Sequence, residues 1–218
     1  MKTGKKALLL ALCAVLLVAA TVMGTMAYLT YTTEAVVNTF TIGKVELDLD
    51  EANVDTKGVM VDETRVKANT YKLMPGHEYT KDPTVTVKAG SEDSYVRMKV
   101  EVKNIASLKA AITDSSFYSD NVFLLEKLVT GWDSTKWQPA GYTETADGSG
   151  IYEFRYATKV DATETNEKLE PLFETIKVPG MVDKDALAKL SDVQINVTAE
   201  AIQADSFADA AAAWKAFA

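Results

Sequence analysis

The run TVTVKAGSEDSYVRMKVEV, residues 84–102, decides the fold class because it alternates apolar and polar side chains twice. In its first half, Val85 and Val87 share one face. Alternation with a period of two is typical of a strand with one buried face. A polar stretch, residues 89–94, separates the halves, so the pattern predicts an antiparallel pair joined by a hairpin loop. The apolar positions of the second half are Val96, Met98, Val100 and Val102.

Similar runs lie on both sides of this stretch. Residues 39–50 alternate, with a shift of phase at Gly43 that indicates a bulge or bend. Residues 141–159 predict a second hairpin, residues 193–201 a further strand, and residues 59–61 a short one. At least six short strands separated by turn residues predict a mainly β protein. They favour an antiparallel β-sandwich over a parallel α/β sheet.

Helical spacing is confined to short segments between the strands. Ile105, Leu108 and Ile112 have it, and residues 183–190 read as a short capped helix. A third inserted helix is expected after an Asp120 cap, with apolar positions at Val122, Leu125 and Val129.

The chain is expected to end in a helix that packs on the sheet. Ser206 is the predicted N-cap, and Asp209 three residues later fits a capping box. The apolar side chains beyond the cap form one stripe at helical spacing. They are Phe207, Ala210, Ala211, Trp214 and Phe217.

The N-terminus has the three parts of an export signal. Three lysines precede an uncharged apolar run, residues 7–23, and small residues follow at Thr25 and Ala27. We expect residues 1–27 to form a signal helix that is cleaved after Ala27, so that Tyr28 becomes the first residue. An uncleaved anchor is the alternative, but the run is a little short to span a membrane. The predicted organisation is a signal peptide at 1–27, an extension at 28–38 and a sandwich domain at 39–218.

Composition limits the partners and the stabilising chemistry. The chain has 31 acidic and 23 basic residues and a formal charge of −8, which argues against nucleic acid as a partner. Cleavage would remove three lysines and no acid, which makes the mature chain more negative. The single cysteine, Cys13, lies in the predicted signal, so we expect no disulfide in the mature protein. The protein is expected to be secreted, to the extracellular matrix or cell surface, and to meet the membrane only before cleavage.

No catalytic or metal-binding constellation is recognisable. His77 is the only histidine, and the fourth position after it is Lys81, so the paired-histidine zinc motif is missing. His77 is expected to be an ordinary turn residue. We therefore predict no enzyme, no catalytic or metal-ligating residues and no cofactor. A calcium site is a weaker alternative to a solvated strand face for the acidic residues Asp48, Asp50, Glu51 and Asp55.

Two tryptophans, Trp132 and Trp137, flank a polar turn. They are candidates for binding cell-wall or matrix glycans. Large aromatic side chains usually pack in cores, and we favour that interpretation.

Three blocks of sequence together resemble the TasA/camelysin family, secreted proteins of Gram-positive bacteria that a dedicated signal peptidase processes. The first block is GTMAYLT, residues 24–30, followed by NTFTIGKV, residues 38–45. The second joins residues 74–76, 81–87 and 95–97, and the third joins residues 201–205 and 212–217. The blocks lie at both ends of the chain and occur in the family's order.

The resemblance implies a jelly-roll-like sandwich that assembles into extracellular biofilm-matrix fibres. In such fibres the freed N-terminal segment of one subunit adds as a strand to the next, and exposed strand edges favour such addition. A secreted metallopeptidase of camelysin type and a cell-surface adhesin or glycan-binding sandwich are the alternative functions. The donor strand would be residues 28–38, with groove-filling side chains at Tyr28, Leu29, Tyr31, Val36 and Val37.

Overall fold

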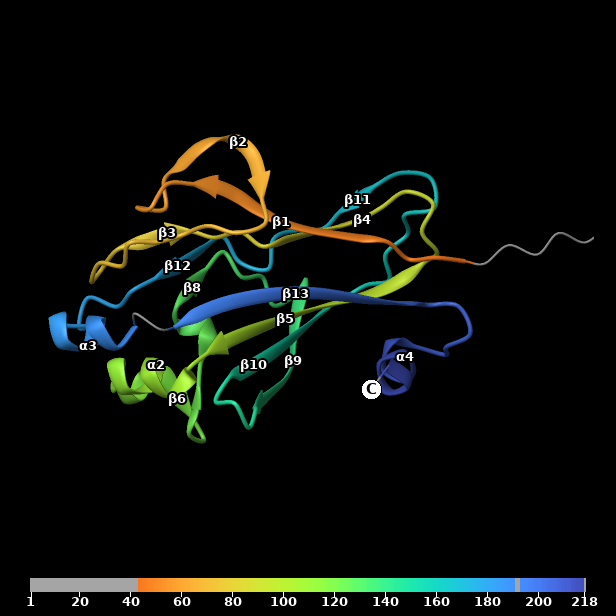
Figure 1. Ribbon diagram of the computed structural model, residues 1–218. Helices are drawn as coiled ribbons and strands as arrows, with labels where there is room; N and C mark the ends of the chain where they lie inside the picture. Colours follow the sequence, from red (N-terminus) through yellow and green to blue (C-terminus); the bar gives the residue numbers. More distant parts are fainter. Residues whose placement is uncertain (1–42, 191–192, 218) are drawn as a thin grey trace, which may run out of the picture. The chain divides into compact units, whose positions relative to one another are not determined.

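Two antiparallel four-stranded sheets form most of the fold in the computed structural model, which describes residues 43–190 and 193–217 (Figure 1). The first has the order β11-β4-β1-β2 and the second the order β13-β5-β10-β9. The predicted mainly β, sandwich-like class is confirmed. The strands of the first sheet are β1 Leu47–Val54, β2 Met60–Val66, β4 Thr84–Val87 and β11 Glu167–Lys168. Those of the second are β5 Ser94–Lys103, β9 Trp137–Glu144, β10 Gly150–Tyr156 and β13 Gln194–Gln203.

Shorter elements lie between these strands. A three-stranded sheet has the order β3-β12-β8, and β6 and β7 form a small hairpin. These strands are β3 Glu78–Thr80, β12 Thr175–Lys177, β8 Val129–Thr130, β6 Tyr118–Ser119 and β7 Val122–Phe123. The helices are α2 Ile105–Ala111, α3 Lys184–Lys189 and α4 Ala210–Phe217, with 3₁₀ turns η1 Ser115–Phe117 and η2 Leu125–Lys127.

The core lies between the two large sheets, and the alternating residues of β4 and β5 supply much of it. Val85 and Val87 of β4 and the four predicted apolar residues of β5 have no solvent exposure and belong to one cluster. The faces were therefore predicted correctly from the period of two.

The predicted pairing of β4 with β5 is wrong. β4 pairs with β1 and β11, whereas β5 pairs with β10 and β13. The intervening loop crosses from one sheet to the other because its backbone is bonded to distant segments. Glu92 N donates to Lys44 O at 2.9 Å, and Ser94 N donates to Val160 O at 2.9 Å.

The other strand predictions fare better. The second hairpin is confirmed as β9 and β10, which pair with a bulge between Glu153 and Phe154. The predicted strand at 193–201 is confirmed as β13. Within the described residues the strand expected at 39–50 begins only at Leu47, and the short strand expected at 59–61 is the longer β2.

Two of the three inserted helices are confirmed. α2 buries Ile105 and Leu108, and α3 begins after Asp183, whose side chain accepts a hydrogen bond from Ala186 N at 2.8 Å. The helix expected after Asp120 is wrong. Asp120 and Asn121 have φ of 49° and 66°, which turns the chain into the β6–β7 hairpin instead.

The terminal helix is present, but its predicted cap is wrong. α4 begins at Ala210, and Asp209 caps it by accepting a hydrogen bond from Ala212 N at 2.8 Å. Ser206 has φ of 74°, outside the extended region that an N-cap adopts. Trp214 is only 3% exposed and its ring lies over the Arg97 guanidinium, so the helix packs on the outer face of β5 as expected. No helix among the described residues is long and apolar enough to cross a membrane.

Candidate functional site

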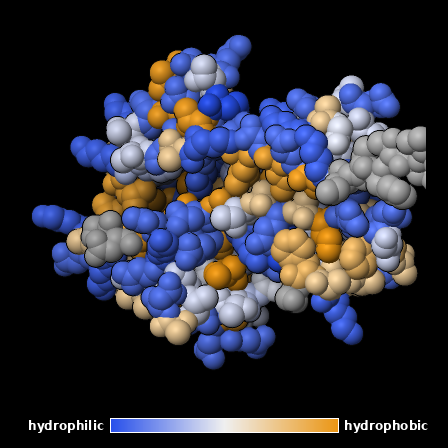
Figure 2. All heavy atoms as spheres, turned by 45° about the vertical axis from the view of Figure 1, so that its right-hand side comes forward, coloured by the Kyte–Doolittle hydropathy of each residue, from blue (hydrophilic) through white to orange (hydrophobic). Residues whose placement is uncertain are grey.

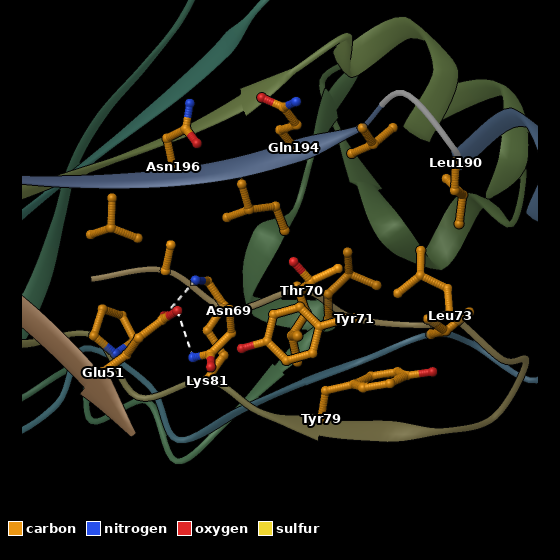
Figure 3. A pocket seen from close by; sticks show the side chains of 18 of the residues that line it. Glu51, Asn69, Thr70, Tyr71, Leu73, Tyr79, Lys81, Leu190, Gln194 and Asn196 are labelled. Atoms are coloured by element: carbon orange, nitrogen blue, oxygen red, sulfur yellow. Dashed lines mark hydrogen bonds and ion pairs between the residues drawn. The ribbon is translucent and has the colours of Figure 1, made fainter. Parts of the chain in front are cut away.

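A groove of about 750 Å³ runs between β13 on one side and β1 with the segment after β2 on the other. Figure 2 shows apolar residues lying in a hollow between hydrophilic rims, and Figure 3 shows part of the groove from close by. Although β1 and β13 are near neighbours, they are not hydrogen-bonded to each other. The groove therefore lies where the two sheets approach without joining.

One wall of the groove is the backbone of β13. Among the described residues, β13 pairs with β5 only, so its other edge has no strand partner there. Gln194 and Asn196 line the groove although their side chains point away from it, so their backbone forms the wall (Figure 3). Ile195 and Val197 are half-buried and pack on the core. An edge without a partner presents N–H and C=O groups to any strand that docks beside it.

The floor is mostly apolar. Tyr71 and Tyr79 meet edge to face, with their ring centroids 5.6 Å apart. The Tyr79 hydroxyl donates to Lys72 O at 2.7 Å and accepts from Met74 N at 2.7 Å, which holds the loop between them. Burial raises the pKa of Tyr79. Other buried apolar residues that line the groove are Pro83, Leu108, Ile112, Leu128, Val178 and Leu190.

A polar cluster of Glu51, Lys81 and Asn69 interrupts the floor. Glu51 is 6% exposed and Lys81 9%, and the Glu51 Oε2 accepts from the Lys81 Nζ at 2.6 Å. The other oxygen, Oε1, accepts from Asn69 Nδ2 at 2.9 Å, so the carboxylate lies between the two nitrogens (Figure 3). The nearby Tyr71 hydroxyl donates to Thr80 O at 3.0 Å, and burial together with the Glu51 charge raises the pKa of Tyr71.

The opposite wall, β1, differs from β13 because basic side chains occupy its carbonyl groups. The Lys67 Nζ donates to Leu49 O at 2.6 Å and forms an ion pair with Asp48. The Arg65 Nε lies 2.8 Å from Asp50 Oδ1, and its Nη2 donates to Asp50 O at 3.2 Å. Charged side chains placed in this way blunt a strand edge. The unprotected edge of the groove is therefore that of β13.

The four acidic residues considered for calcium do not converge on one point. Asp48 contacts Lys67 and Lys88, and hydrogen bonds from Lys67 first and Lys88 second lower its pKa. Asp55 accepts from the backbone of its own turn. Among the described residues, no group of three or more metal-ligating side chains could hold an ion. The expected solvated strand face is wrong for Glu51, whose buried position depends on a partner thirty residues away, Lys81.

His77 and the two tryptophans occupy the places expected of ordinary structural residues. His77 lies in the turn after Gly76, and its Nε2 is 2.8 Å from Lys57 O. Trp137 is fully buried and its Nε1 donates to Glu170 O at 2.9 Å. Trp132 is partly buried, and its Nε1 donates to Trp137 O at 2.8 Å. Trp137 therefore belongs to the core, and Trp132 packs against it.

The residues predicted to act in processing and assembly lie outside the described residues. The structure instead provides a feature that the sequence pattern missed, the groove beside β13. Alternation along residues 193–201 marked the inner face of that strand but carried no information about its edge. The residues outside are the cleavage positions Thr25, Ala27 and Tyr28, and the donor positions Tyr28, Leu29, Tyr31, Val36 and Val37.

No family model, curated protein or solved structure matches this chain. Its function must therefore be inferred from the groove, the adjoining sheet edge and the sequence itself.

Proposed function

We propose that this protein is a secreted structural subunit of extracellular biofilm-matrix fibres. The N-terminal segment of one copy, residues 28–38, adds as a strand to β13 of the next copy. The observation that carries this proposal is the edge of β13, which has no partner among the described residues and borders an apolar groove.

Strand addition would stabilise this region in two ways. It pairs the backbone N–H and C=O groups along the edge of β13. It also covers half-exposed apolar side chains such as Ile195 and Val197, and burial stabilises by about 25 cal/mol per Å² of apolar surface. A single docked strand could supply both contributions.

The sequence of residues 28–38 suits one wet and one buried face. As a strand, its odd positions would share a face that carries Leu29, Tyr31 and Val37. The even positions carry Thr30, Thr32 and Glu34 on the other face. This pattern reduces the five predicted groove-filling side chains to three, Leu29, Tyr31 and Val37. It directs the other two, Tyr28 and Val36, away from the groove.

The export signal and the family resemblance support the same function. Cleavage after Ala27 would free Tyr28 as the tip of the donor segment, which links assembly to secretion. The three blocks that resemble the TasA/camelysin family include this segment. No specific feature of the described residues favours the metallopeptidase or glycan-binding alternatives, since Trp137 is buried and His77 contacts a backbone carbonyl.

The proposal is tested on the secreted protein by N-terminal sequencing and electron microscopy of one sample. We expect a chain that starts at Tyr28 and forms filaments. Deletion of residues 28–37 should abolish filaments, and a synthetic peptide of residues 28–38 should raise the melting temperature of the shortened protein. Filaments that persist after the deletion would disprove strand donation.

A matched pair of substitutions tests the predicted face of the donor. Tyr31→Asp places a charge on the face directed into the groove, and Thr32→Asp places the same charge on the opposite face. We expect the first to prevent filaments and the second to permit them. Equal behaviour of the two variants would contradict the docking geometry.

A further inference from the structure

We propose that Lys81 and Asn69 become joined by an intramolecular isopeptide bond, with Glu51 as the catalytic proton-transfer group. This inference concerns chemistry inside one subunit and does not depend on the proposed assembly. It rests on three side chains from separate segments that meet in the floor of the groove (Figure 3).

Glu51 contacts both groups whose protons must move. Its Oε2 is 2.6 Å from the Lys81 Nζ, the atom that would become the nucleophile. Its Oε1 is 2.9 Å from Asn69 Nδ2, the atom that would leave as ammonia. One carboxylate can therefore take a proton from the amine and return one to the leaving nitrogen, the arrangement that general acid–base catalysis requires.

The amide of Asn69 is held and polarised by the backbone of β1. Its Oδ1 accepts a hydrogen bond from Val54 N at 3.1 Å, and its Nδ2 donates to Ala52 O at 2.8 Å. The Val54 N–H therefore points at the oxygen on which negative charge develops when the amide carbon is attacked. A fixed backbone donor at such an oxygen stabilises the tetrahedral intermediate.

The reacting pair lies in largely apolar surroundings. Glu51 and Lys81 are both buried, and Tyr71, Tyr79 and Pro83 line the same groove. The lysine proton that must move lies on a nitrogen 2.6 Å from the carboxylate that would take it. An uncharged amine is the form that attacks a carbonyl carbon.

The reaction needs no other reagent. Proton transfer gives a neutral Lys81 amine and a neutral Glu51 acid. The amine nitrogen forms a bond to Asn69 Cγ, and the carbon–nitrogen bond to Nδ2 breaks. Glu51 gives its proton to the departing nitrogen, which leaves as ammonia, and takes the second proton of the attacking nitrogen, which leaves Glu51 as the neutral acid. Release of that proton to the departing ammonia, which then escapes as ammonium, restores the carboxylate. The four-carbon side chain of Lys81 supplies the freedom for the Nζ to reach the amide carbon.

The bond would tie the segment after β2 to the end of β3 beneath the groove. Lys81 is already fixed at its backbone, where its N–H donates to Glu174 O at 3.0 Å. The chain has only one cysteine, Cys13, and it lies in the predicted signal. An amide link would therefore give the mature chain a covalent cross-link in the absence of a disulfide.

Mass spectrometry of the purified secreted protein tests the proposal directly. We expect an intact mass that is lower, by one ammonia, than the mass calculated from the sequenced N-terminus. After trypsin digestion, residues 68–72 should be found joined to residues 73–88, because a modified Lys81 is no longer cut. An unmodified mass with separate peptides, or a mass that shows only deamidation, would overturn the proposal.

Variants then identify the roles. Glu51→Gln and Lys81→Met should both restore the full calculated mass, whereas Lys67→Ala, which changes another lysine of the same groove, should keep the loss of ammonia. The mass of the unsubstituted protein shows whether the isopeptide bond forms, even if a variant fails to fold. Loss of ammonia that persists in Glu51→Gln would overturn the catalytic role of the carboxylate.

Discussion

Two largely buried charged centres lie within the described part of the chain, and they are enclosed differently. On the outer face of β5, the Arg97 side chain is 9% exposed and pairs with Glu200 at 2.5 Å and Glu153 at 3.2 Å. The rings of Trp214 and Phe217 both lie 4.7 Å from its guanidinium carbon. In the groove, the Lys81–Glu51 pair is as well buried, but the apolar side chains around it remain half-exposed.

The two centres differ in whether another segment of the same chain covers them. The chain closes the Arg97 centre with its own terminal helix, and cation–π contacts there add to the ion pairs. At the groove, the described residues leave β13 with an open edge. The first centre is therefore expected to contribute mainly to stability, and the groove to both stability and association.

The largest expected effect on stability comes from removing the Trp214 side chain, which covers the Arg97 guanidinium. Trp214→Ala takes a buried indole from α4 and exposes the guanidinium below it, so we expect a loss of about 3–5 kcal/mol in the free energy of unfolding. Lys215→Ala, on the exposed side of the same helix, should change it by less than about 0.5 kcal/mol. Urea denaturation of both variants measures the difference, and a loss below about 1 kcal/mol for Trp214→Ala would show that α4 is dispensable.

Lys81→Met tests the groove centre in the same way. It removes the nitrogen that contacts the buried Glu51 carboxylate, together with the proposed amide link. We expect a loss of about 3 kcal/mol in the free energy of unfolding, because an uncompensated buried charge is costly. A double variant, Glu51→Leu with Lys81→Met, removes the charge as well but also the proposed covalent bond. It should therefore remain less stable than the unsubstituted protein in urea denaturation. Full recovery would indicate that the pair acts only as an ion pair.

The open edge is tested by neighbouring residues on opposite faces of β13. Ile195→Lys places a charge in the groove, and Asn196→Lys places it on the face that points away (Figure 3). We expect the first to prevent filaments at a cost of about 1–2 kcal/mol in unfolding free energy, since Ile195 is only half-buried. The second should form filaments normally. Electron microscopy and urea denaturation of the two variants decide this.

The difference between β4 and β13 shows what the sequence could and could not predict. Alternation assigned the buried faces of both strands correctly, because side-chain direction is a local property. The pairing partner of a strand is not a local property. A tight two-residue turn would have required β4 and β5 to pair, but the loop of residues 88–93 has no such turn and crosses between the sheets. The polar cluster in the groove could not be predicted from the sequence either, because its members are far apart in the chain. It depends on Glu51 and Lys81, which meet only after folding.

The caps of α4 show a second limit of local patterns. Ser206 and Asp209 together match a capping box, yet only Asp209 caps the helix. We expect Asp209→Ala to cost about 1 kcal/mol in the free energy of unfolding. Ser206→Gly should instead increase it by less than about 1 kcal/mol, because glycine adopts a positive φ without strain. Equal losses in both variants, measured by thermal denaturation, would restore Ser206 as the cap.

The smallest effect concerns the pH dependence of the Arg97 centre. Burial alone would raise the pKa of Glu200, but hydrogen bonds and charge from Lys99 and Arg97 outweigh it, so the pKa lies below its ordinary value of 4.5. The unfolded chain then binds the proton more readily than the folded one. The stability that Glu200 contributes is therefore present above pH 4.5 and is lost as the pH falls through the lower, folded pKa.

Because the carboxylate is partly exposed, we expect the free energy of unfolding of Glu200→Gln to differ from that of the unsubstituted protein by less than about 1 kcal/mol at neutral pH. That difference should shrink as the acid is titrated, and a difference that grows on acidification would reverse the sign of the linkage and remove Glu200 from the stabilising pair.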